Sequence, residues 1–123
     1  MRNEFWYKAE ENLKAAHVLF EHGWYNAAAN RAYYAAFHAA IAKLIRRGVT
    51  HEKNDHGWVQ ANFNNEFVHK TKIYPDRFKA YLLDLQAVRN RADYKAESVS
   101  QKIVSRQLAK AAEFVNMLAQ EEF

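Results

Sequence analysis

The 123-residue sequence contains no cysteine, only one proline and only three glycines. The absence of cysteine excludes a disulfide framework, a thiolate nucleophile and cysteine-ligated metal sites. Because proline and glycine interrupt helices, their scarcity beside alanine-rich segments favours a nearly all-helical chain. No apolar run reaches the roughly 20 residues of a membrane-spanning helix, and the first residues lack the apolar centre of a signal peptide. We therefore expect a cytoplasmic protein that makes no membrane contact.

Composition indicates one folded domain. Half of the residues are hydrophobic, which is more than a disordered chain carries. We found no linker, repeat or low-complexity segment, so we expect residues 1–123 to form a single domain. Lys and Arg number 18 against 14 Asp and Glu, a net charge of +4. This excess is compatible with a polyanionic partner but does not require one.

Apolar residues recur at helical spacing along most of the chain. The spacing predicts helices at about residues 3–22 and 24–47, a shorter one after Asp55, one from about residue 76, and a last one for which Ser98-x-x-Gln101 has the form of a capping box. Four long amphipathic helices with short connections predict an all-α fold, an antiparallel four-helix up-and-down bundle with one short extra helix. The second helix is apolar almost all round, so we expect it to lie centrally or to be shared with a second subunit.

The second predicted helix carries polar side chains that a bundle core does not need. Arg31 and His38 are seven residues apart and so lie on one face, two turns from each other, with Tyr34 between them. Burying an arginine destabilises the fold by several kcal/mol unless a carboxylate pairs with it. Removing one member of a buried ion pair has a cost of roughly the same size.

The fourth predicted helix carries a second polar group, in Arg89-Asn-Arg-Ala-Asp-Tyr94. Arg89 extends the apolar stripe of this helix, and Asp93 follows it by one turn. Asp93 is therefore the expected partner of Arg31, of Arg89 or of both. Arg91 adds a third guanidinium close by. A cleft lined by convergent polar groups from the two helices is the default hypothesis for a functional site.

A simpler interpretation needs no functional site. Arg89 and Asp93 could form a surface pair worth only about 0.3–0.5 kcal/mol. His38 could be a core histidine bound to a backbone carbonyl, and the tyrosines could be core residues. The clustering of these side chains favours the site, but each residue taken alone is compatible with the simpler interpretation.

Other chemistries find little support in the sequence. The six histidines show neither the three-residue nor the four-residue helical spacing of a metal-binding pair, so we expect no metal. No glycine-rich phosphate loop and no serine in a nucleophile elbow is present. We expect no cofactor.

The two motifs and the helices around them resemble the HEPN domain (higher eukaryotes and prokaryotes nucleotide-binding). The resemblance is carried by Asn30-Arg-Ala-Tyr-Tyr-Ala-Ala-Phe-His38, by a loop histidine before Gly57, and by residues 89–94, and it covers about residues 9–114. The sequence is most similar to the small prokaryotic variant with the motif Arg-x-x-Ala-Asp-Tyr. This resemblance implies a four- or five-helix bundle that is often dimeric and that binds nucleotides or cleaves RNA without a metal. It also implies a toxin–antitoxin setting, beside a minimal nucleotidyltransferase-type antitoxin.

The sequence departs from the ribonuclease members of the family, in which four to six residues separate the motif arginine from a histidine. Tyr94 stands where the shortest form of that motif would place the histidine. A phenol with a pKa near 10 is a poor general base at neutral pH, whereas imidazole titrates in the working range. His38 is the candidate that the sequence offers for the missing proton transfer.

Three functions follow as hypotheses. In the first, a HEPN protein of toxin–antitoxin or defence type binds RNA or a nucleotide through Arg31, Tyr34, Arg91 and Asp93 together with Arg89. In the second, it is a metal-independent endoribonuclease with Arg89, His38 and Tyr94 as catalytic residues. In the third, it is a non-catalytic helical bundle that binds a partner, with Asp93 as a structural counter-ion. We also expect a homodimer, because of the two-sided apolarity of the second helix.

Overall fold

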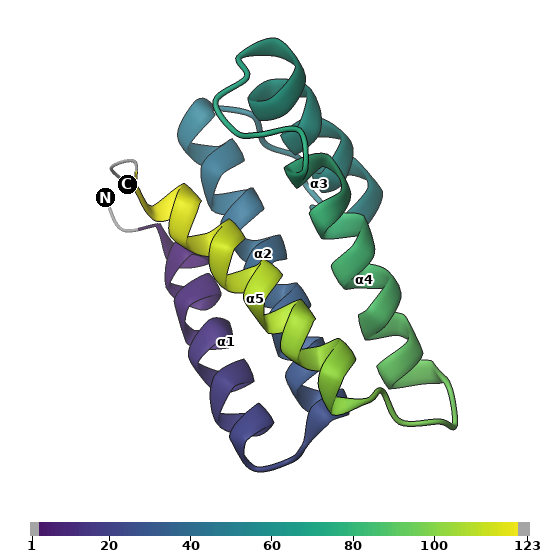
Figure 1. The fold of residues 1–123 in the computed structure, drawn as a ribbon. Coiled ribbons are helices and arrows are strands. Elements are labelled where there is room, and N and C mark those ends of the chain that lie inside the picture. The colour runs from purple at the N-terminus through teal and green to yellow at the C-terminus, as the bar shows by residue number, and fades with distance from the viewer. Residues whose placement is uncertain (1–2, 121–123) are drawn as a thin grey trace.

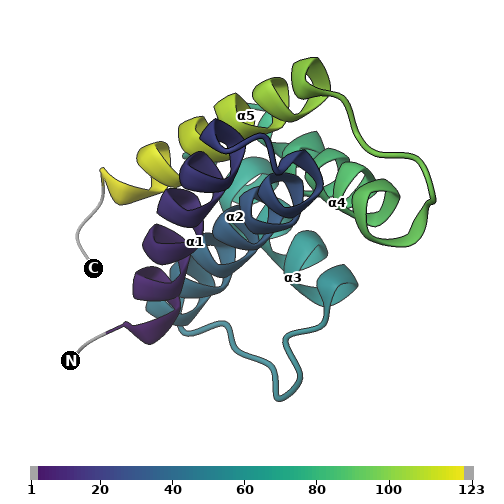
Figure 2. The ribbon, with the colours of Figure 1, turned by 90° about the horizontal axis from the view of Figure 1, so that it is seen from below.

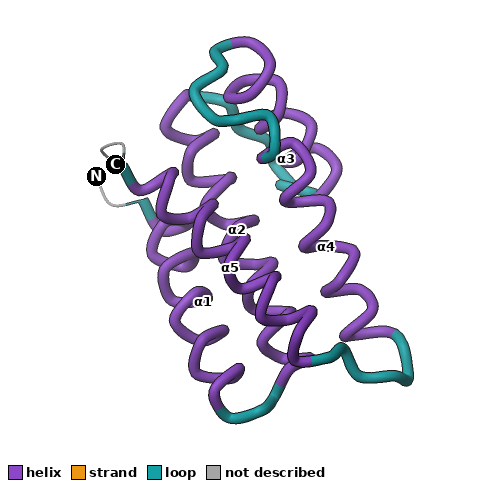
Figure 3. The backbone as a smooth tube through the Cα atoms, viewed as in Figure 1, coloured by secondary structure: helices purple, strands orange, loops and turns teal. Residues whose placement is uncertain are grey.

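The protein is all-α. The computed structural model describes residues 3–120, and no strand occurs among them (Figure 3). The helices are α1 (Glu4–Glu21), α2 (Tyr25–Arg47), α3 (His56–Phe63), α4 (Phe78–Tyr94) and α5 (Gln101–Ala119), with a π-helical segment η1 (Asn64–Lys70) directly after α3. The predicted all-α bundle, four long helices and a shorter one, is confirmed. None of the helices in this part of the chain combines the length and the apolarity needed to cross a membrane.

Helix α2 lies at the centre of the bundle. Figure 2 shows it surrounded by α1, α5, α4 and α3, and the chain direction alternates from α1 to α2, α4 and α5 (Figure 1). Thirteen α2 residues are buried inside the single chain, eight of them alanines. Alanine has the smallest side chain that still favours a helix, so neighbouring helices can approach α2 closely from several sides. The two-sided apolarity of α2 is therefore explained within one chain.

Side-chain caps fix where several helices begin. The Asn3 side-chain oxygen accepts a hydrogen bond from the Trp6 N–H at 3.3 Å, and the Asp55 carboxylate accepts one from the Trp58 N–H at 2.9 Å. Such caps satisfy backbone donors that have no partner inside the helix. At the C-terminal end of α2, Gly48 adopts φ of +82°, a left-handed conformation that glycine reaches without strain. The predicted cap at Asp55 is confirmed.

The predicted cap of α5 at Ser98 is wrong. Ser100 caps this helix instead, its hydroxyl accepting from the Ile103 N–H at 3.2 Å. The reason is a competing set of contacts with α2: Asn26 donates to the Ser98 hydroxyl at 3.3 Å and accepts from the Val99 N–H at 2.9 Å. Val99 is buried, so this stretch is held as an extended connection and the helix starts two residues later.

The π-helical segment η1 was not predicted. Two adjacent residues of this segment, Phe67 and Val68, are buried, as is Phe63 at the end of α3. The Thr71 hydroxyl donates to the Glu66 carbonyl at 2.7 Å and satisfies an acceptor at the end of the segment.

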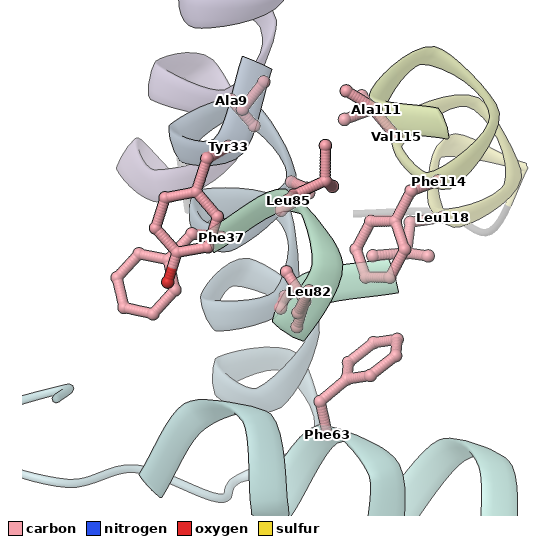
Figure 4. Packing of buried hydrophobic residues seen from close by; sticks show 14 of the residues in the cluster. Ala9, Tyr33, Phe37, Phe63, Leu82, Leu85, Ala111, Phe114, Val115 and Leu118 are labelled. Carbon is pink, nitrogen blue, oxygen red and sulfur yellow. The ribbon is translucent and has the colours of Figure 1, made fainter. Parts of the chain in front are cut away.

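The core is a contiguous apolar cluster that joins all the helices (Figure 4). Its centre is aromatic: the Phe114 ring on α5 lies 5.1 Å from the ring of Phe63 on α3 and 5.1 Å from that of Phe78 on α4. All three residues are fully buried. This cluster fixes α3, α4 and α5 relative to one another, and so it positions the polar residues that α2 and α4 carry at the other side of the bundle.

Candidate functional site

Helices α2 and α4 bring two arginines together through a bridge of polar side chains. Arg31 Nε donates to the Asn30 side-chain oxygen at 2.8 Å, and the Asn30 amide nitrogen donates to Asp93 Oδ2 at 2.9 Å. The same Asp93 oxygen lies 2.9 Å from Arg89 Nε. The expected pairing of Asp93 is therefore confirmed directly for Arg89, whereas Arg31 reaches Asp93 only through Asn30.

Both guanidinium groups also lie against one aromatic ring. The Cζ atoms of Arg31 and Arg89 are 5.2 Å and 5.3 Å from the centre of the Tyr34 ring. Because these two distances sum to 10.5 Å, the two cations lie no farther apart than that. Cation–π contacts of this kind contribute about 0.5–1 kcal/mol at exposed sites and more when desolvated. Tyr34 therefore holds two like charges close together with a single carboxylate, Asp93, between them.

The pair of Arg89 and Asp93 is only partly shielded from water. The side chain of Arg89 is 14% exposed and that of Asp93 is 25% exposed. Arg89 Nε, although close to Asp93, is buried without a directed hydrogen bond, and Nη1 donates to the Asn90 side chain at 3.1 Å. The contact with Asp93 is thus chiefly one of charge, and Arg89 retains donors that an incoming acceptor could use. The Arg89–Asp93 ion pair is therefore partly buried and partly open to water.

His38 accepts a hydrogen bond from Asn12. Arg31 Nη1 donates to Asn12 Oδ1 at 2.9 Å, which fixes the orientation of that amide, and Asn12 Nδ2 then donates to His38 Nδ1 at 3.1 Å. The proton of the neutral imidazole therefore sits on Nε2. Burial, with smaller contributions from Lys8 and Arg31, lowers the pKa of His38 to about 4. This arrangement suits an acceptor for Asn12 better than the general acid or base that the sequence suggested.

His56 also lies near the site, although it is not among the site residues predicted from the sequence. It is the first residue of α3, its Nδ1 is hydrogen-bonded to the Tyr33 hydroxyl, and its ring lies 4.6 Å from that of Phe37. Burial and then the charge of Arg89 lower its pKa, against the opposing effect of Asp55. Burial also raises the pKa of Tyr33, so the phenol keeps its proton. The available signal was its position between the helix cap Asp55 and Gly57, which the family motif already includes.

The structure brings most of the predicted site residues together, but not all of them. Arg31, Tyr34, His38, Arg89 and Asp93 form the connected group described above. Tyr94 reaches the group through its ring, 5.5 Å from the Arg89 Cζ, and is otherwise 72% exposed. The exception is Arg91.

Arg91 lies on another side of α4. Two residues along a helix turn the side-chain direction by about 200°, so Arg91 points nearly opposite to Arg89. It lines a groove between α4 and α5 instead. The expectation that the three arginines act in one cleft is therefore wrong for Arg91.

The lowered pKa of His38 predicts a pH-dependent stability. A histidine whose pKa is about 4 in the fold and about 6.5 when unfolded binds its proton more readily in the unfolded chain. The stability is then fully present above pH 6.5 and is lost as the pH falls toward 4. Urea unfolding midpoints should decrease between pH 7 and pH 5, and His38→Gln should reduce that decrease. A variant with the same pH dependence as the parent would contradict the assignment; the remainder is expected from His56, whose pKa is also lowered.

These features define a helical bundle in which two neighbouring helices carry a pair of arginines that contact the same tyrosine ring. The HEPN domain family matches residues 3–122, which is nearly the whole sequence. The chain belongs to this family.

Curated relatives agree with this membership. A candidate toxin of Methanocaldococcus jannaschii is 41% identical over 83 residues, covering 58% of this chain and 60% of the relative. A UPF0332 protein of Thermotoga maritima is 37% identical over 79 residues, covering 63% of this chain and 58% of the relative. A second candidate toxin of Methanocaldococcus jannaschii is 30% identical over 89 residues, covering 72% of this chain and 58% of the relative. The chain thus matches about three-fifths of the length of these relatives.

Proposed function

We propose that this chain is a HEPN domain of toxin type that binds RNA or a nucleotide through Arg31 and Arg89. The observation that carries the proposal is the pair of guanidinium groups within 5.3 Å of the same Tyr34 ring, with one carboxylate for two cations. The pair therefore keeps one positive charge in excess. A phosphodiester neutralises that excess, and the planar fork of arginine matches two phosphate oxygens at once.

The surrounding contacts prepare the two arginines for a ligand. Asn12 and Asn30 bind Arg31 from two sides, while Asp93 and Asn90 hold Arg89. Side chains that are already ordered lose less conformational entropy when they bind. The exposed ring of Tyr94 beside Arg89 offers a flat surface on which a base can stack, a contact worth about 1–3 kcal/mol in single-strand binding proteins.

The biological setting in the proposal comes from the relatives. Two of them carry the name of candidate toxins, and the proposal extends that role to this chain. The proposal also includes a cytoplasmic location, expected from the sequence, and a homodimer and a nucleotidyltransferase-type antitoxin, which the family resemblance implies. Sedimentation at micromolar concentration tests the dimer: a monomer there would remove it from the proposal.

Salt-dependent RNA binding tests the proposal. A labelled single-stranded RNA should bind the purified protein in EDTA, and the logarithm of the affinity should fall with the logarithm of salt by about 0.7 for each phosphate contact. Two arginine contacts predict a slope of about −1.4. Binding that is absent, or that does not change with salt, would contradict the proposal.

A second candidate function, RNA cleavage, is favoured by the position of His56. Its Nδ1 is bound to Tyr33, and its ring is near enough to Arg89 for that charge to lower its pKa. If Nδ1–H donates to the tyrosine oxygen, Nε2 is free to take the proton of an RNA 2′-hydroxyl. The 2′-oxygen then bonds to phosphorus, the bond to the 5′-oxygen breaks, and that oxygen takes a proton from water. Arg89 would stabilise the charge that develops on the phosphorane.

Cleavage of labelled RNA in EDTA distinguishes His56 from His38. His56→Ala and Arg89→Ala are each expected to abolish cleavage, whereas His38→Gln should retain most of it. Cleavage that survives in His56→Ala and disappears in His38→Gln would assign the proton transfer to His38 instead. No cleavage by the parent protein would leave RNA binding as the function.

A further inference from the structure

A second basic site lies between α4 and α5, away from the Arg31–Arg89 pair. Here the two helices enclose a groove of about 470 Å³. Ile103, Arg106, Gln107 and Lys110 line it from α5 at the spacing of one helix face, and Val88 and Arg91 line it from α4. The groove is therefore lined by one face of α5 and by residues of α4.

The groove carries an excess of positive charge. Arg91 and Arg106 are both exposed, and among the described residues neither has an ion-pair partner. The carboxylate in the groove, Asp84, is already bound to Lys110 and to Gln107 Nε2, the latter at 3.2 Å. These two hydrogen bonds outweigh the effect of burial and hold the pKa of Asp84 below its usual range, so it stays charged and paired. Three cations against one carboxylate leave a charge of +2 on the lining.

The volume of the groove fits a ligand of nucleotide size. Its volume lies within the roughly 300–1,000 Å³ of small-ligand sites. The lining includes two apolar side chains, buried Val88 and half-buried Ile103, that can cover one face of a ribose or base. Arginines and apolar side chains in one lining fit a phosphate linked to a sugar and a base.

We propose that the α4–α5 groove is a second phosphate-binding site, which holds a nucleotide of the same RNA strand that Arg31 and Arg89 contact. The inference rests on the proposed function. Arg89 and Arg91 are two residues apart on the last turns of α4 and point to nearly opposite sides of it. A single strand that leaves Arg89 can therefore pass around the exposed end of α4 near Tyr94 and enter the groove at Arg91. The two sites together bind a longer RNA than either site alone.

Two RNA lengths and two pairs of variants test the inference. The probes are single-stranded oligouridylates of about 4 and about 12 nucleotides, the span of site sizes typical of single-strand binding folds. In Arg91→Gln/Arg106→Gln, the affinity for the longer RNA should fall about tenfold and the salt slope should become shallower by about 1.4, because two phosphate contacts are lost. Affinity for the short RNA should stay unchanged. Lys14→Gln/Arg46→Gln removes the same charge from exposed positions outside the groove and serves as the matched control.

The outcomes separate this inference from the proposed function. If the parent protein binds neither RNA, both fail. If the parent binds both, and the groove variant behaves like the charge-matched control at both lengths, the groove site alone is overturned. A polyglutamate peptide is the second probe: loss of its binding in the groove variant, with RNA binding retained, would assign the groove to an acidic polypeptide and overturn the inference. Because both replaced arginines are exposed, we expect the variants to keep the unfolding midpoint of the parent, which a urea titration checks.

Discussion

Replacing Arg89 with glutamine is expected to lower the affinity for single-stranded RNA by about 30- to 100-fold. A hydrogen bond to a charged group contributes about 1.5–3 kcal/mol when its loss leaves a partner unsatisfied. Two effects combine here. The variant loses a phosphate contact, and it leaves Asp93 without its ion pair, so that a free carboxylate faces the incoming phosphate. The measurement is a binding titration at fixed salt in EDTA.

Asp93→Asn separates these two effects. The double variant Arg89→Gln/Asp93→Asn removes the repelling carboxylate and should recover part of the lost affinity, to within about tenfold of the parent, because a single charged hydrogen bond is then missing. Asp93→Asn alone should leave RNA affinity unchanged or slightly raised. It should cost only about 1–2 kcal/mol of stability, because the ion pair is partly exposed and Asn30 can still donate to the new amide oxygen. An affinity loss in Asp93→Asn as large as that in Arg89→Gln would mean that Asp93 itself holds the ligand.

Replacing Phe114 with alanine is expected to destabilise the fold by about 3–5 kcal/mol. Phe114 is fully buried between Phe63 and Phe78, and its removal opens a cavity where α3, α4 and α5 meet. A loss of this size is a large part of the 5–15 kcal/mol typical of a whole domain. Urea unfolding measures it. The control is Leu83→Ala on α4, an apolar residue that is 62% exposed, for which a change within about 0.5 kcal/mol is expected. Equal effects of the two substitutions would contradict the observed core.

Much of the fold could be predicted because helical periodicity reports which face of each segment is buried. The apolar stripes of α1, α4 and α5 contact α2 as the spacing indicates, and the cap at Asp55 was visible as a side chain of the right type before an apolar run. The α5 cap failed for a reason that is not local. Ser98 has the right chemistry, but Asn26, distant in sequence, binds it and its neighbour. A pattern in one segment does not reveal such a contact.

The site was predicted to a similar extent, and for similar reasons. Charged residues on apolar helices stand out in the sequence, so Arg31, Arg89 and Asp93 could be found. The uncharged residues that join them, Asn12 and Asn30, could not, because asparagine is common at positions without a role. For Arg91 the error was the reverse: the residue was assigned to the site, but it lies in the groove between α4 and α5.

Arg91 and His56 both show that separation along the sequence does not predict which residues lie close together in the fold. Arg91 is close to Arg89 in sequence, yet the helix turns it toward another groove. His56 is distant from both motifs, yet the fold places it near Arg89.

The most direct test of the account is a double-mutant cycle on RNA affinity with Arg31→Gln and Arg89→Gln. The central claim is that these two arginines, held on the same Tyr34 ring and linked through Asn30 and Asp93, act as one phosphate-binding site. Residues that share partners are expected to show an interaction energy of about 0.5–3 kcal/mol. The double variant should therefore bind more tightly than the product of the two single losses predicts. Effects that multiply without interaction would show two independent contacts and would contradict the claim.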